Sequence, residues 1–72
     1  MFTEELNFFI KNQDNLVKQY AGKALVIKGN ELCGMYDTPL EAYIQLQRDD
    51  QLGKAMIQMC QPGPAAYSAT LN

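Results

Sequence analysis

The stretch Thr38-Pro39-Leu40-Glu41 constrains the fold of this chain more than any other. Thr38 suits the N-cap of a helix, Pro39 suits the first helical position, and Glu41 completes a capping box. A helix that begins here and runs to about Asp50 lies between two strand-like segments. Because a helical crossover joins those two strands, we expect them to run in the same direction within one sheet.

The first part of the chain has the pattern of an amphipathic helix. Residues 4–20 place apolar side chains at helical spacing, Thr3 can cap the start, and Gly22 suits a left-handed residue after the end. Several residues in the middle of this stretch are poor helix formers. The alternative is therefore a helix that begins near Asn12, with residues 1–11 as a separate turn.

Two short apolar runs predict an antiparallel hairpin. Residues 23–28 and 32–36 are joined by Gly29-Asn30-Glu31, whose glycine and asparagine tolerate positive φ. Residues 54–60 are expected to form a third strand, because a hairpin needs one to be stable. The helix propensity of this third stretch is not low, so periodicity alone does not decide between strand and helix.

The order helix, hairpin, helix, strand predicts a single α+β domain over residues 1–72, with residues 62–72 as an extended C-terminal tail. We expect a three-stranded, mainly antiparallel sheet in the spatial order 2-1-3, covered on one face by both helices. The competing order 1-2-3 needs a parallel pair, which is usually buried on both faces. The predicted core consists of Phe9, Ile10, Leu16, Val17, Tyr20, Leu25, Ile27, Leu40, Tyr43, Ile44 and Ile57.

Composition and charge argue against several functions. The net charge is −2 and the six basic residues are scattered singly, which disfavours nucleic acid as a partner. There is no histidine, so the commonest general base and metal ligand are missing. Cys33 and Cys60 are too few for a disulfide scaffold or a structural zinc site, and we expect two inert thiols. The sequence thus predicts a cytoplasmic protein that is not an enzyme, with no cofactor, no metal and no membrane partner.

Three stretches carry a resemblance to a known family. They are a Tyr-x-Gly-Lys turn within residues 15–23, the Thr-Pro-Leu-Glu-Ala helix start within 36–43, and the strand and Pro-Gly-Pro turn within 52–67. Together they resemble a family of small bacterial α+β domains of unknown function. The resemblance implies the same order of elements and carries over no catalytic, cofactor-binding or metal-binding residue. Lys54-Ala55-Met56 departs from the family pattern, in which threonine precedes aromatic and aliphatic residues.

The carboxylates and tyrosines define an alternative function. Asp37 precedes a helix start and Asp49-Asp50 ends that helix, and adjacent residues do not share a helix face. We therefore expect turn and helix-end chemistry here rather than a metal or acid–base site. The four tyrosines are expected at the edge of the core. A small ligand-binding domain or minor enzyme using these carboxylates and tyrosines is the alternative to a non-catalytic interaction module.

The expected sheet has a second apolar face, which predicts self-association. If Leu25, Ile27 and Ile57 face the helices, the alternate side chains face away from them. An apolar face left in water usually marks an interface. We therefore expect a homodimer, formed through this face or by exchange of the C-terminal tail, or another protein partner. The expected interface residues are Ala24, Val26, Met35, Met56, Cys60 and Tyr67.

Overall fold

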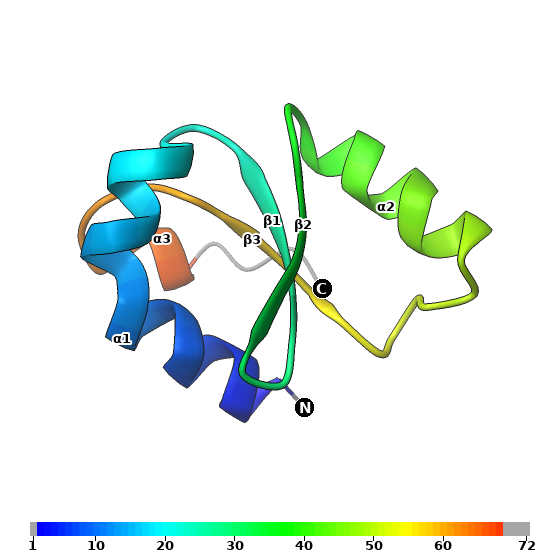
Figure 1. Cartoon of the computed structure of the whole chain (residues 1–72), viewed down its shortest axis with the longest axis horizontal. Helices are drawn as coiled ribbons and strands as arrows, with labels where there is room; N and C mark the ends of the chain where they lie inside the picture. The colour runs from blue at the N-terminus through cyan, green and yellow to red at the C-terminus, as the bar shows by residue number, and fades with distance from the viewer. Residues whose placement is uncertain (1, 69–72) are drawn as a thin grey trace.

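The computed structural model describes the backbone of residues 2–68 and the side chains of residues 2–66. The elements are α1 (Thr3–Tyr20), β1 (Ala24–Lys28), β2 (Glu31–Tyr36), α2 (Pro39–Arg48), β3 (Met56–Met59) and α3 (Ala65–Ser68). The strands form one antiparallel sheet in the order β2-β1-β3 (Figure 1). The predicted α+β class and the 2-1-3 strand order are therefore confirmed, and residues 56–59 are a strand rather than a helix.

The first helix is continuous from Thr3 to Tyr20, so the alternative of a helix that begins near Asn12 is wrong. The Asn12 side chain, which weakens the helix in isolation, donates a hydrogen bond to the Phe8 carbonyl oxygen at 2.9 Å. Thr3 is the first helical residue and not the cap, because Phe2 occupies the N-cap without a side-chain hydrogen bond. Gly22 has φ +84° just after the helix, as predicted.

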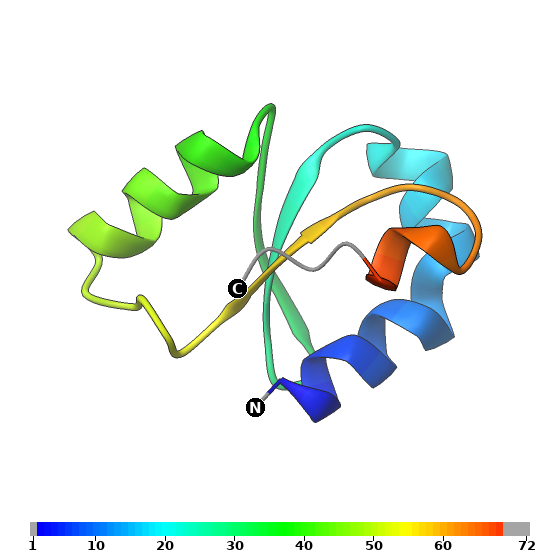
Figure 2. The same ribbon diagram turned by 180° about the vertical axis from the view of Figure 1, so that it is seen from behind.

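The two long helices lie on opposite faces of the sheet, so the prediction that both cover one face is wrong. Figures 1 and 2 show α1 and α3 together on one side and α2 on the other. Leu25 and Ile27 pack in the cluster under α1, whereas Val26 packs in the cluster under α2. The physical reason is the uninterrupted apolar run of β1, which needs cover on both of its faces.

The strand register places Ile57 and Met56 on the faces opposite to those predicted. Cross-strand partners share a face, and Ile27 pairs with Met56 while Val26 pairs with Ile57. Ile57 therefore lies on the α2 face and Met56 on the α1 face, the reverse of the expectation. A β-bulge interrupts the other ladder, where Val26 pairs with Gly34 and Ile27 pairs with Leu32, which leaves Cys33 without a partner in the register.

The end of the chain is not extended where the structure describes it. Residues 65–68 form the short helix α3, and Ala66 is fully buried against the α1 face. The buried Gln58 side chain donates hydrogen bonds to the carbonyl oxygens of Ala66 (2.6 Å) and Met59 (3.0 Å). Residues 69–72, the rest of the expected tail, lie outside the described residues.

Five of the eleven predicted core residues are buried, and two more, Val17 and Tyr20, are partly buried and pack against the α1 cluster. The remaining four are exposed, and three of them belong to α2. The exposed four are Ile10, Leu40, Tyr43 and Ile44. The core prediction is thus least accurate for α2.

Candidate interaction surface

Local sequence chemistry fixes the start of α2. Thr38 is extended at φ −134°, and its hydroxyl oxygen accepts a hydrogen bond from the Glu41 backbone N–H at 3.2 Å. Pro39 is the first helical residue, so the predicted cap is confirmed. At the other end Asp50 has φ +57° and turns the chain back, and the Gln51 N–H donates to the Leu46 carbonyl oxygen at 2.8 Å. The length of α2 is therefore defined by contacts at both ends.

The side of α2 that faces the sheet is narrow. Ala42 is fully buried and Leu46, one turn later, is almost so. They pack against a cluster that includes Val26 and Ile57. Because alanine has only a methyl side chain, the helix backbone can approach the sheet closely at Ala42. Two residues one turn apart are thus the buried contacts that fix α2 on the sheet.

The opposite side of α2 carries large apolar side chains into solvent. Leu40 is 66% exposed, Tyr43 is 48% exposed and Ile44 is 39% exposed. Residues at spacing i, i+3 and i+4 are neighbours on a helix surface, so these three side chains form one continuous patch. We call this patch the α2 outer face. It is the candidate functional surface of the described chain, and the sequence expectation had placed all three residues in the core.

Two opposite charges lie along one side of the α2 outer face. Glu41 and Arg48 are both exposed and are seven residues apart, nearly two helical turns. They therefore lie along the same side of the helix, about 10 Å apart along its axis. Neither forms an ion pair with another described residue. Asp49 is engaged differently, because the Gln45 side-chain amide lies 3.2 Å from both of its carboxylate oxygens.

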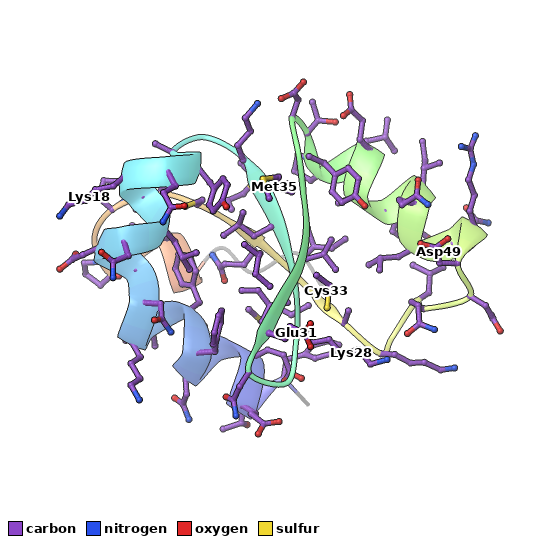
Figure 3. All side chains as sticks on the ribbon, viewed as in Figure 1. Lys18, Lys28, Glu31, Cys33, Met35 and Asp49 are labelled. Atoms are coloured by element: carbon purple, nitrogen blue, oxygen red, sulfur yellow. The ribbon has the colours of Figure 1, made fainter. Side chains whose placement is uncertain are left out.

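The predicted interface residues do not share a surface. Ala24 and Val26 are buried under α2, and Met56 and Cys60 are buried in the cluster under α1. The prediction of an open second sheet face is wrong, because α2 covers that face. Met35 is 43% exposed on β2, and Figure 3 shows it far from Asp49 at the end of α2. Tyr67 belongs to α3, and its side chain lies outside the described residues.

Asp37, one of the carboxylates of the alternative hypothesis, has a local partner. Asp37 forms a salt bridge with Lys23, and the hydrogen bond and positive charge of Lys23 hold the pKa of this carboxyl below its usual value. No group of three or more cysteine, aspartate or glutamate residues in the described part of the chain is placed to hold a metal ion. Both cysteines are free, and burial raises the pKa of the Cys60 thiol, which makes it less reactive.

One open groove of about 430 Å³ lies beside the first half of α1. Its lining consists of Asn7, Phe8, Lys11, Asn12 and Asn30. These are three amides, one ammonium group and one ring, so this groove does not gather the carboxylates and tyrosines of the alternative hypothesis.

No helix in the described residues is both long and apolar enough to cross a membrane.

Comparison with known proteins does not show a family for this chain. No family model, no curated protein and no solved structure matches it. The resemblance to a family of small bacterial α+β domains therefore stays a prediction that rests on the turn and cap residues.

Proposed function

We propose that this protein is a non-catalytic interaction module and that the α2 outer face is its contact surface. The observation that supports the proposal is the exposure of three adjacent large apolar side chains, Leu40, Tyr43 and Ile44, on one helix. Single exposed apolar residues are common on protein surfaces, whereas a contiguous patch is characteristic of an interaction site. The sequence keeps these three side chains on the solvent side while Ala42 and Leu46 hold the helix on the sheet.

The chemistry of the patch suits protein binding. Burial of apolar surface contributes about 25 cal/mol per Å², so covering the patch is favourable. Tyr43 adds a ring that buries a large area and a hydroxyl group that can hydrogen-bond at the rim of an interface. Because α2 is capped at Thr38 and packed on the sheet, little ordering entropy is lost when a partner binds it.

Site-specific photo-crosslinking tests this proposal. A photoreactive amino acid replaces Gln47, which is exposed at the margin of the α2 outer face, and in a control chain it replaces Asp14 on α1. We expect protein adducts from position 47 that disappear when Ile44→Lys is added, and no such adducts from position 14. Equal labelling from both positions, or adducts that survive Ile44→Lys, would show that the α2 outer face is not a contact surface.

A further inference from the structure

We infer that the partner of the α2 outer face is a second copy of this chain, bound as an antiparallel α2–α2 pair about a two-fold axis. The inference rests on the proposed function and names the occupant of the same surface. The charge pattern around the patch carries it, since that pattern is complementary to itself only when the two helices run in opposite directions.

The pairing geometry follows from the positions of Glu41 and Arg48. Both lie along one side of the outer face, near the two ends of α2. A two-fold axis that runs between the two helices, perpendicular to them and level with Ile44, midway between the two charges, places Glu41 of each copy next to Arg48 of the other. One dimer therefore gains two symmetric ion pairs. A parallel pair, whose two-fold axis lies along the helices, instead sets the charged side of each copy against the Tyr43 side of the other, so neither ion pair forms.

The same axis also brings the apolar side chains together. Ile44 lies closest to the axis and meets its own counterpart, while Leu40 meets the aliphatic part of Arg48 from the other copy. Tyr43 lies on the side of the patch away from the charges, where it closes the second edge of the contact. The two charged side chains are available for this pairing, because neither has an ion-pair partner among the described residues.

The size of the surface predicts a weak dimer. One face of a ten-residue helix buries less than the roughly 800 Å² per partner of a standard interface. We therefore expect a dissociation constant on the order of 100 µM, with fast exchange between monomer and dimer. Association is to be measured on the full chain by sedimentation equilibrium from about 10 µM to about 1 mM, a range that brackets the expected constant.

Charge reversal provides the decisive test. Glu41→Arg and Arg48→Glu each create two like-charge contacts in the antiparallel pair, so each alone should weaken self-association by about tenfold or more. An equimolar mixture of the two variants restores both ion pairs and should associate about as well as the unmodified chain. Asp14→Arg and Lys18→Glu are the matched controls: they make the same charge changes on exposed positions of α1 and should leave association unchanged.

Each outcome has one meaning, provided that circular dichroism shows every variant to be folded. A chain that stays monomeric at about 1 mM contradicts the self-pairing, whereas position-47 adducts with a different protein would still support the proposed function. A dimer that is insensitive to both reversals also contradicts the inference. A mixture that associates no better than either variant alone shows that Glu41 and Arg48 do not pair between copies, and this contradicts the antiparallel geometry.

Discussion

The two faces of the sheet are covered in different ways. The α1 face lies under an 18-residue helix and α3, and side-chain hydrogen bonds fasten these elements to the rest of the fold. Glu5 accepts from the Gly29 N–H at 2.7 Å, and the Gln13 amide donates to the carbonyl oxygens of Gln61 (2.8 Å) and Gly63 (2.9 Å). The α2 face lies under a ten-residue helix anchored by Ala42 and Leu46. One helix thus contributes mainly to the core, and the other leaves three of its large apolar side chains exposed.

The largest expected effect is on stability, and it is seen by comparing the removal of a buried ring on α1 with the removal of an exposed ring on α2. Phe9 is fully buried, so Phe9→Ala should lower the free energy of unfolding by about 3–5 kcal/mol, enough to unfold a domain of this size. Tyr43→Ala removes a half-exposed ring and should change that free energy by only about 0.5 kcal/mol. Urea unfolding measures both variants, and comparable losses would contradict the proposed division between the two helices.

The next effect concerns the buried amide that holds α3. Gln58→Leu leaves the Ala66 carbonyl oxygen without this donor in a buried environment, and we expect a loss of about 1–3 kcal/mol. In hydrogen-exchange measurements, the Gln58→Leu variant should speed exchange at the Ala66 amide, relative to the unmodified chain, more than at other amides. Gln19→Met, on an exposed position of α1, is the control and should have little effect. Unchanged stability in the Gln58 variant would mean that α3 does not depend on this side chain.

A smaller effect separates the two helix starts. Thr38→Ala removes the side chain that caps α2 and should cost about 1 kcal/mol, while Thr38→Ser should retain most of the stability. Thr3→Ala should be nearly neutral, because Thr3 lies within α1 and caps nothing. Thermal unfolding of the three variants provides the measurement. If Thr3→Ala loses as much stability as Thr38→Ala, then Thr3 caps α1, which contradicts the structure.

The smallest effect is the pH response of Asp37. Its pKa is lowered in the folded chain by Lys23, so the associated stability is present above the pKa of the unfolded chain, about 4, and is lost as the pH falls through the lower folded value. Lys23→Met should raise the Asp37 pKa toward its usual value, as measured by NMR titration. Because the carboxyl is exposed, added salt should reduce the shift in the unmodified chain. A pKa that is the same in both chains would exclude the ion pair in solution.

Features encoded within a few neighbouring residues could be predicted from the sequence. The Thr38 cap, the left-handed Gly22 and the hairpin each depend on local chemistry, and the strand order follows from one helical crossover. The faces of β1 and β3 could not be assigned, because which face a side chain occupies depends on pairing register between distant segments. One signal was available: the unbroken apolar run of β1 already indicated cover on both faces.

The candidate surface was missed for a related reason. Apolar residues surround more than one side of α2, so periodicity does not show which side faces the sheet. The bulkier side chains Leu40, Tyr43 and Ile44 were expected inside, whereas the structure buries Ala42 and Leu46. Which side of α2 packs on the sheet depends on how closely the helix approaches the sheet, and the sequence of the helix alone does not show this.

The bulge in β2 has a consequence for aggregation. β2 lies at an edge of the sheet, and such strands are templates on which further chains can stack. The extra residue, Cys33, breaks the regular ladder in the middle of the strand, and a charged Glu31 stands exposed at its start. An incoming strand would meet an irregular row of backbone groups and an acidic side chain. The fold therefore discourages open-ended stacking of further strands on the β2 edge.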